Sequence, residues 1–535
     1  MNTMKRILAV LLVAAMVAGC CACGGSDSKT NNNPLEGNTY VAGFPIVKEK
    51  EKLEIMTIKQ VNHGDFDEMG FTKYYEDMTN IDIEWMVTTE AEYDSNLTLM
   101  FQSKNLPDVI SLPLNIFGSD RLLEYSKKGD IIQLDDLIDK YAPNIKKLLE
   151  TCPEFKAAAT AADGKIYSLP TVQIDSENHE RFPQKLYIRK TWLDNLGLDV
   201  PTTAEEFYDV LKAFKTGDPN GNGQPDEIPL ATRGIDPSFF GSFGVSFNYN
   251  NDSLYVDDNG KVGFGYGCDA TKEALAFYNR LYSLGLCENY DSDSKWKTKL
   301  KNGLVGVFYY LADFTVVGTD LEDEYVMIAP FDGSAKADPV MSVSGAYYPN
   351  AYLITNKCEN PIAAIRWADY LYSTDGYFLL TYGQPGDMIE KDDNGHWNYT
   401  DYDRSKDRFT FTPGFVLPYY VDDETLSIFN NKDAAGMTDL EKASQQLIEE
   451  TKDTYYGKYE PKNLIWMLPY DDQALDVIDQ YQDNIFEYAS QMMGQFAFGY
   501  RNIDTEWDAY IAELNKKGLP LVLAEYQRLY DAVHE

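Results

Sequence analysis

The chain has 535 residues, with 85 acidic and 47 basic side chains, a formal net charge of −38 and a sequence pI of about 4.4. An acidic surplus of this size excludes a duplex nucleic-acid partner, because phosphate binding needs a basic surface. The four histidines leave little room for histidine-based metal or triad chemistry, and the hydrophobic content of 44% is typical of a folded protein with large lobes. The 39 tyrosines suit a dense core or a surface that stacks on ring-shaped ligands.

The amino terminus predicts export. Lys5 and Arg6 precede an apolar run over 7–18 that is too short to span a membrane and suits a signal peptide over 1–19. The small residues before Cys20 resemble a bacterial lipobox, in which that thiol receives a diacylglycerol and anchors the protein by two acyl chains. Residues 20–47, rich in Gly, Asn and Ser up to Asn38, are expected to be a flexible tether.

The body then alternates between strand and helix patterns. A first group of segments has a β-α-β-α-β rhythm, which predicts a mostly parallel sheet covered by helices: strand 52–58, helix 66–79, strand 81–87, helix 90–103 and strand 106–112. Later segments repeat the alternation: two helices in 190–216, a helix at 269–286, a strand at 304–310 and a helix at 361–373. After about residue 435 the pattern is mainly helical, over 438–452, 471–494 and 505–534. The class is therefore α/β with a helical carboxy-terminal portion.

Four cysteines remain in the body, at positions 152, 268, 287 and 358. Their wide spacing fits neither a dense disulfide framework nor a zinc site. They are interpreted as buried thiols, and one disulfide among them stays open.

The sharpest local motif runs from Asp218 to Glu227. It places oxygen-bearing side chains at every second position with glycines between, as a hard cation such as Ca²⁺ requires. Gly223 stands where an EF-hand loop turns sharply, but Pro229 stands where such a loop has its last glutamate. We therefore expect an EF-like structural Ca²⁺ site with these candidate ligands: Asp218, Asn220, Asn222, Gln224, Asp226 and Glu227. The alternative is a turn without metal, because Asn and Gly favour turns in any case.

Several stretches spread over the chain resemble the extracellular solute-binding lipoproteins of carbohydrate ABC transporters. The resemblance is to the long aldouronate- or oligosaccharide-type proteins and to the alginate-binding proteins. The matching stretches are Gly43–Val47, Asn105–Ile110, Asp163–Pro170, Tyr187–Phe207, the calcium-type loop, Trp507–Tyr510 and Leu514–Gly518.

The resemblance implies a two-lobed periplasmic-binding-protein-like (type II) fold, with strands that cross between the lobes and ligand held in the cleft. It implies an amino-terminal lobe of 48–172 plus 311–375 and a carboxy-terminal lobe of 173–310 plus 376–535. The implied function is capture of an oligosaccharide on the outer face of the cell membrane and its delivery to the permease subunits of an importer. We expect a lipid-anchored monomer that is not an enzyme.

Ligand residues are expected where strands end or where the lobes cross, because binding clefts of open α/β sheets lie at the carboxyl ends of strands. Aromatic rings would stack on sugar faces, and polar side chains would bind hydroxyls. The candidates are Ser111, Asn115, Arg233, Phe239, Phe240, Tyr309, Tyr310, Tyr347, Tyr348 and Gln384. Tyr310 is the preferred stacking platform.

Three other functions stay open at this point, and one of them is a lipid-anchored adhesin or sensor without a role in transport. An exported glycoside hydrolase would need only two suitably placed carboxylates, and 85 acidic residues always offer a pair. A binding protein for a non-sugar ligand such as a peptide would share the size and composition.

Overall fold

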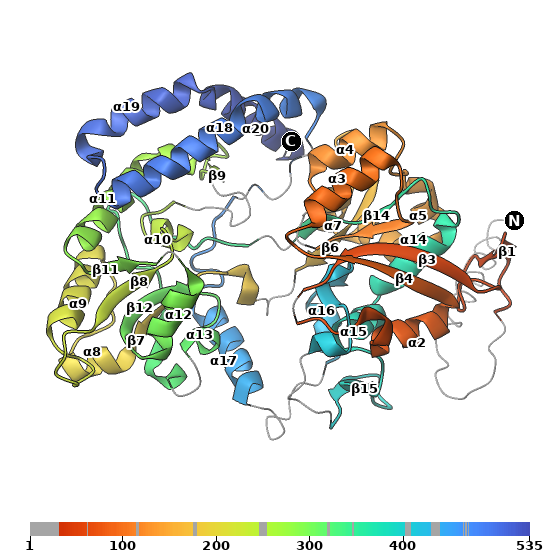
Figure 1. The fold of residues 1–535 in the computed structure, drawn as a ribbon, viewed down its shortest axis with the longest axis horizontal. Coiled ribbons are helices and arrows are strands. Elements are labelled where there is room, and N and C mark those ends of the chain that lie inside the picture. Colours follow the sequence, from red (N-terminus) through yellow and green to blue (C-terminus); the bar gives the residue numbers. More distant parts are fainter. Residues whose placement is uncertain are drawn as a thin grey trace, which may run out of the picture.

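The computed structural model describes residues 31–534 apart from 61, 114–116, 175–178, 246–253, 291, 318–320, 345–346, 402–407, 430–438, 464, 466–467 and 469. The described chain forms two α/β lobes, each built around its own sheet (Figure 1). This confirms the expected fold class, with helices dominating the carboxy-terminal portion. The expected signal peptide and Cys20 lie outside the described residues.

The first lobe contains a six-stranded sheet in the order β17-β6-β14-β5-β3-β4. Its strands are β3 (Glu51–Ile58), β4 (Ile81–Thr88), β5 (Val109–Ser111), β6 (Ser168–Gln173), β14 (Tyr347–Ile354) and β17 (Tyr420–Val421). β3 pairs in parallel with β4 and β5, and β17 pairs in parallel with β6, whereas β14 runs antiparallel between β5 and β6. Every strand except β14 therefore ends at the same edge of the sheet.

Helices cover both faces of this sheet and bury its apolar side chains. They are α2 (Gly70–Thr79), α3 (Tyr93–Ser103), α4 (Ser119–Lys127), α5 (Asp135–Tyr141), α6 (Pro143–Thr151), α7 (Pro153–Ala159), α14 (Pro361–Leu371), α15 (Thr374–Tyr382) and α16 (Asp423–Ser427), with a hairpin of β15 (Ile389–Lys391) and β16 (Trp397–Tyr399). Trp367 of α14 is fully buried, and its carbonyl accepts a hydrogen bond of 2.6 Å from the Tyr75 hydroxyl. Tyrosines such as Tyr75 thus contribute to the core while their polar ends are satisfied.

The second lobe contains a five-stranded sheet in the order β11-β8-β12-β7-β13. Its strands are β7 (Lys185–Arg189), β8 (Ile228–Thr232), β11 (Cys287–Asn289), β12 (Val305–Tyr310) and β13 (Tyr325–Ile328), and a small hairpin joins β9 (Leu254–Val256) to β10 (Val262–Phe264). The surrounding helices are α8 (Lys190–Leu196), α9 (Ala204–Thr216), α10 (Pro237–Gly241), α11 (Asp269–Ser283), α12 (Asp293–Lys301), α13 (Phe314–Val317) and α17 (Asp439–Thr454). β11, β8 and β12 are mutually parallel, and β7 runs antiparallel to β12 and β13.

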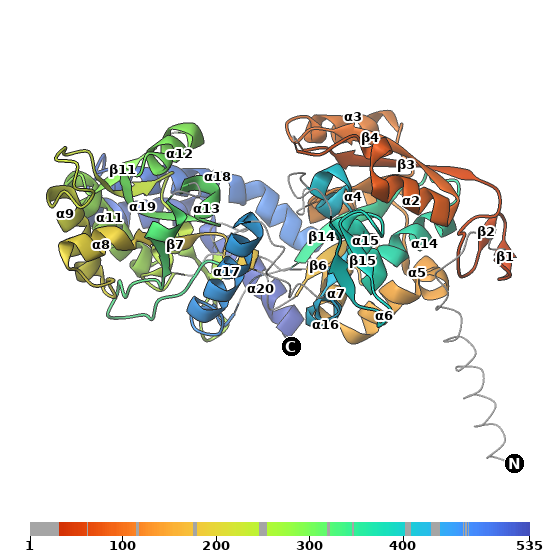
Figure 2. The same ribbon diagram turned by 90° about the horizontal axis from the view of Figure 1, so that it is seen from below.

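Three helices at the carboxy terminus complete the second lobe: α18 (Asp472–Ala497), α19 (Ile503–Lys516) and α20 (Leu519–His534). α18 packs against α11 and α20. The segment 505–534, expected as one helical stretch, is divided because Gly518 has a φ of 104°, which a right-handed helix does not contain. The free end of α20 lies on the side of this lobe that faces the first lobe (Figures 1 and 2).

Strand pairing divides the chain between the lobes at other residues than the resemblance implied. β13 lies beyond residue 311 but pairs with β7 of the second lobe, and β17 lies beyond 376 but pairs with β6 of the first. The later crossings therefore fall between β13 and β14 and between α16 and α17. Periodicity shows that a short segment is a strand, but which sheet it joins depends on a partner far away in the chain.

Residues 31–47, expected to belong to the flexible tether, are docked on the first lobe instead. β1 (Leu35–Glu36) pairs with β2 (Thr39–Tyr40), and Ile46 and Val47 are fully buried. The Arg366 guanidinium of α14 donates hydrogen bonds to the carbonyls of Tyr40 and, at 2.7 Å, Gly43. Hydrogen bonds to backbone carbonyls do not depend on the side chains of the residues that accept them. The polar composition of this segment therefore gave no sign that it is docked.

The four body cysteines are free thiols, as the spacing suggested: Cys152 and Cys287 are buried, and Cys268 and Cys358 are half-buried. Within the described part of the chain, no helix is both long enough and apolar enough to cross a membrane.

Candidate functional site

The carboxyl ends of the parallel strands in both sheets lie beside the segments that cross between the lobes. The chain leaves the first sheet after β6 and enters the second at Lys185, which pairs with Tyr310, the last residue of β12. It returns at Tyr347, the first residue of β14, which pairs with Val172 near the end of β6. The fold thus brings the ends of both sheets, where open α/β sheets bind ligands, to the same region of the molecule.

On the second-lobe side, Tyr310 is half-buried in a group of aromatic and cationic side chains. Its ring centroid lies 5.3 Å from that of the buried Trp296, at an interplanar angle of 42°. The Arg233 guanidinium carbon lies 5.4 Å from the Tyr310 centroid and 4.9 Å from that of Trp296, and the Lys297 ammonium lies 5.7 Å from the Tyr310 centroid. The structure therefore unites the predicted residues Tyr310 and Arg233.

The other aromatic candidates of this lobe occupy its core. Phe239 and Phe240 are 1% and 2% exposed, and Tyr309 is 5% exposed. All three pack in the main hydrophobic cluster of the second lobe, so their rings offer no exposed face for stacking. Tyr309 points to the opposite face of β12 from Tyr310. The face of Tyr310 is covered as well, since Phe308 on it is fully buried, and Tyr310 is only half-buried at the last position of the strand.

The first-lobe candidates are spread more widely. Ser111 is fully buried and its hydroxyl donates to the carbonyls of Ala351 (3.2 Å) and Val416 (2.9 Å), so it supports β5. Tyr347 and Tyr348 are half-buried at the start of β14, beside the crossing, and burial raises the pKa of Tyr347 to about 12. Gln384 donates a hydrogen bond of 3.2 Å to Asp387. Asn115 lies outside the described residues.

The structure also groups aromatic side chains that the sequence did not indicate. His63 and Phe66 follow the end of β3, and Trp85 lies on the neighbouring strand β4. The His63 ring lies 5.2 Å from Phe66 and 4.8 Å from Phe409, and Phe66 lies 5.2 Å from Trp85. The sequence could have indicated His63, because it stands just after the first strand. It could not have indicated the contact with Phe409, because the two residues are far apart in the chain.

The loop predicted to bind calcium is tightly curled. The Asp218 carboxylate accepts the Gly223 N–H at 3.2 and 3.1 Å, and the Asn220 and Asn222 amides both donate to Asp226 Oδ1, at 3.2 and 3.1 Å. Gly221 and Gly223 have φ values of 69° and 71°, which their lack of a Cβ permits. The oxygen-bearing side chains are therefore drawn together, as a cation site requires.

Glu227 provides the test of whether the loop fits a cation. The residue is 9% exposed, and its buried Oε1 has no hydrogen-bond partner. Burial, and then repulsion from Asp226 and Asp218, raise the pKa of this carboxyl. A buried anion next to two others is costly unless a positive charge is present, so the residues fit Ca²⁺. No group of three or more His, Cys, Asp or Glu side chains in the described chain is placed to hold a metal, so amide and carbonyl oxygens would have to complete this site.

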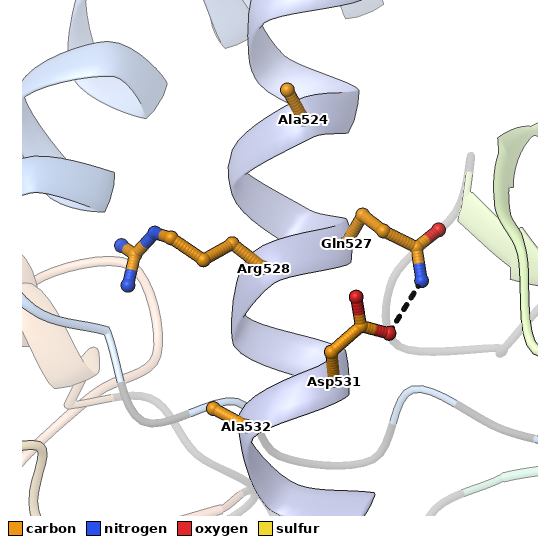
Figure 3. A pocket seen from close by; sticks show the side chains of 5 residues that line it. All are labelled: Ala524, Gln527, Arg528, Asp531 and Ala532. Carbon is orange, nitrogen blue, oxygen red and sulfur yellow. Dashed lines mark hydrogen bonds between the residues drawn. The ribbon is translucent and has the colours of Figure 1, made fainter. Parts of the chain in front are cut away.

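A hollow beside α20 is a separate feature, and Figure 3 shows the side chains that line it. All its lining residues come from this one helix: Ala524, Gln527, Arg528, Asp531 and Ala532. Gln527 donates to Asp531 across it at 2.8 Å (Figure 3). With a single helix as its wall, the hollow is a surface feature and lacks residues from the strand ends described above.

Comparison with known proteins identifies the class. The family model of the bacterial extracellular solute-binding proteins matches residues 61–378, and the chain belongs to this family. It is a solute-binding protein and not an enzyme.

The particular relatives cover almost the whole chain. The fructooligosaccharide ABC transporter substrate-binding protein FusA of Streptococcus pneumoniae is 31% identical over 98% of this chain and 97% of its own length. The structure of FusA in complex with kestose has a TM-score of 0.76 at 27% identity and covers 90% of this chain and 99% of that one. FusA has also been solved as an EF-hand mutant in complex with fructo-nystose. A human-milk-oligosaccharide-binding solute-binding protein of Bifidobacterium longum infantis has a TM-score of 0.77 at 25% identity, covering 91% and 99%.

Proposed function

We propose that this protein is the substrate-binding component of an ABC importer and captures an oligosaccharide between its two lobes. The observation that carries this is the group of Tyr310, Trp296 and Arg233 where second-lobe strands end beside the crossings. A half-exposed aromatic ring next to a hydrogen-bond donor suits a sugar, which has an apolar C–H face and hydroxyls at its rim. The full-length similarity to FusA makes a fructooligosaccharide the first ligand to test.

Binding would be coupled to closure of the lobes. A ligand that contacts both lobes stabilises the closed form through its higher affinity for that form, and no other effect of the ligand can shift this equilibrium. The segments that cross between the lobes, next to Lys185 and Tyr347, would be the hinge about which the lobes move. The closed, loaded protein would be the form that the permease subunits accept.

The test is a thermal-shift and calorimetric screen of the protein with both lobes against four oligosaccharides: kestose, nystose, lacto-N-tetraose and trigalacturonate. A true ligand raises the melting temperature and is recovered intact. Replacing Tyr310 with alanine should weaken binding roughly tenfold, since an aromatic stack contributes about 1.5 kcal/mol, whereas Tyr310→Phe should keep most of the affinity. Tyr500→Ala, at a ring that is 79% exposed, is the matched control. Unchanged affinity in Tyr310→Ala would remove this ring from the site.

We also propose that the protein is an exported lipoprotein held at the membrane through Cys20, after removal of residues 1–19. The described chain is docked on the first lobe from residue 31 onward, so the anchor would lie shortly before this docked segment. Cys20→Ser should release the protein from the cell surface into the medium, which fractionation and immunoblotting would measure. Retention on the cell would contradict lipid anchoring at this residue.

Calcium in the Asp218–Glu227 loop is the last part of the proposal. The orphaned Glu227 oxygen and the curled loop support it, as does the EF-hand named for a FusA variant. The ion would stiffen the connection between α9 and β8, far along the chain from Tyr310, so its role would be structural.

A further inference from the structure

Asn289 is the last residue of β11 and lies beside the chain where it leaves β8. β11, β8 and β12 are neighbouring strands, and the register pairs Asn289 with Thr232, the last residue of β8. Arg233 follows Thr232 directly, and its guanidinium belongs to the group around Tyr310. Asn289 therefore lies at the carboxyl end of its strand, next to the backbone that carries Arg233.

The Asn289 side chain holds the turn that follows Arg233. Its Oδ1 accepts a hydrogen bond of 2.6 Å from the Gly234 N–H, and the Tyr290 N–H donates to the Thr232 carbonyl at 2.9 Å. These two bonds continue the pairing of β11 with β8 beyond the last residues of the strands. They hold the backbone on both sides of Arg233.

The bond to Gly234 fixes a conformation and is not needed to satisfy a buried polar group. Gly234 is half-buried and Asn289 is exposed, so water could satisfy this N–H if the side chain were absent. Gly234 has a φ of 82°, a left-handed conformation that a sharp turn requires. Glycine has the widest choice of backbone conformations of any residue, and a hydrogen bond from outside the turn narrows that choice.

Arg233 needs such support at its backbone because its side chain is long and exposed. Its guanidinium carbon lies 4.9 Å from the centroid of the buried Trp296 ring and 5.4 Å from that of Tyr310. The stacking holds the far end of the side chain, and the turn sets where the side chain begins. A side chain that is ordered before the ligand arrives loses less conformational entropy on binding, so the affinity is higher.

We propose that Asn289 is a positioning residue of the sugar site: it holds the turn after Arg233 and so keeps the guanidinium where it donates to a sugar hydroxyl. Its effect on affinity is exerted through Arg233. The inference rests on the proposed function, because it assumes that the group around Tyr310 binds an oligosaccharide. It goes beyond that function by naming a residue that acts on the site from a neighbouring strand.

A double-mutant cycle tests whether Asn289 acts through Arg233. Calorimetry gives the affinities of the wild type, Asn289→Ala, Arg233→Ala and the double variant for kestose, or for whichever of the four oligosaccharides the wild type binds most tightly. Arg233→Ala should bind about tenfold more weakly, because it removes a charged hydrogen-bond donor. Asn289→Ala should bind about fivefold more weakly, because the guanidinium is then less well ordered before binding. The double variant should match Arg233→Ala within twofold, since Asn289 has nothing left to position.

Asn502→Ala is the control for a purely structural effect. The Asn502 side chain also accepts backbone N–H groups, those of Asp504 and Thr505 at 3.0 and 3.1 Å, but it does so at the start of α19. Its loss should lower the melting temperature, because it removes a helix cap. The affinity of this variant should stay within twofold of the wild type.

The outcomes separate this inference from the proposed function. If the wild type binds an oligosaccharide but Asn289→Ala or Arg233→Ala binds it within twofold of the wild type, the role of Asn289 is overturned and the proposed function stands. The same holds if the two losses multiply in the double variant, or if Asn502→Ala loses as much affinity as Asn289→Ala. If the wild type binds none of the four oligosaccharides, both fail.

Discussion

Removing calcium is expected to destabilise the second lobe, and Glu227 is the residue that can show why. Asp218→Ala would be ambiguous, since its carboxylate also accepts the Gly223 N–H and its loss would loosen the loop without any ion. Glu227→Gln is sharper because Oε1 of Glu227 has no partner to lose. The substitution keeps the shape of the side chain and removes one of three neighbouring negative charges.

The size of the effect follows from binding linkage. Calcium sites of extracellular modules have dissociation constants of about 10⁻⁴–10⁻³ M. At a concentration about 100-fold above the constant, the ion stabilises the folded state by about 2.7 kcal/mol. For a lobe of this size that corresponds to about 5–10 °C in melting temperature.

Glu227→Gln should change the melting temperature in opposite directions without calcium and with it. In EDTA the variant should melt at or above the wild-type temperature, because burial and the charges of Asp226 and Asp218 disfavour the ionised carboxyl. In 10 mM CaCl₂ it should melt below the wild type, because it has lost an anionic ligand.

Differential scanning calorimetry in EDTA, CaCl₂ and MgCl₂ measures these shifts. The magnesium arm controls for general screening in a chain of net charge −38. A wild-type melting temperature that does not respond to EDTA, together with no heat of calcium binding on titration, would refute the cation site.

Three further predictions concern the scaffold and its pH response. Arg366→Ala removes two charge-assisted hydrogen bonds to the amino-terminal segment and should cost about 3 kcal/mol, with proteolysis before residue 48 becoming faster than in the wild type. Gly376→Ala should lower the free energy of unfolding in urea by about 3 kcal/mol, because a Cβ at this position would clash with the Tyr370 carbonyl. Gly494→Ala is the control and should be neutral or stabilising, because the nearest atom to a Cβ there is 4.0 Å away. Equal effects of the two substitutions would contradict the packing around Gly376. Burial lowers the pKa of Lys185 from 10.5 to about 7, so the unfolded chain binds more protons than the folded chain between these pH values. The free energy of unfolding should therefore rise with pH across this window, and Lys185→Met should flatten that rise. An unchanged dependence of stability on pH in the variant would exclude Lys185 as its source.

Local patterns were sufficient for many of the helices and strands of this chain. The alternation over 52–58 and 81–87 corresponds to β3 and β4, and the two helices expected in 190–216 are α8 and α9. α9 begins at a capping box between Thr203 and Glu206, a purely local signal. The curled loop from Asp218 is local too, which is why residue spacing alone could indicate it.

The candidate binding residues show the limit of such patterns. Ser111 and Phe239 lie at or just beyond strand ends, as expected of ligand residues, but their neighbours in space bury them. Tyr310 and Arg233 come together because two strands pair at a given register. Trp296 of α12 completes the same group from a separate segment, and no short-range signal connects it to Tyr310.

The sequence by itself indicated the class of protein through matching stretches spread over the chain. It also determined several helices and strands and the position of the curled loop from Asp218, because these depend on residues within a few positions of one another. The tertiary structure decided which strand joins which lobe, that residues 31–47 are docked and which tyrosines are free to bind. Tyr75, Tyr352 and Tyr372 all donate their hydroxyls to buried backbone carbonyls, so their rings serve the core. Burial is a property of contacts between distant segments, and only folding brings those contacts about.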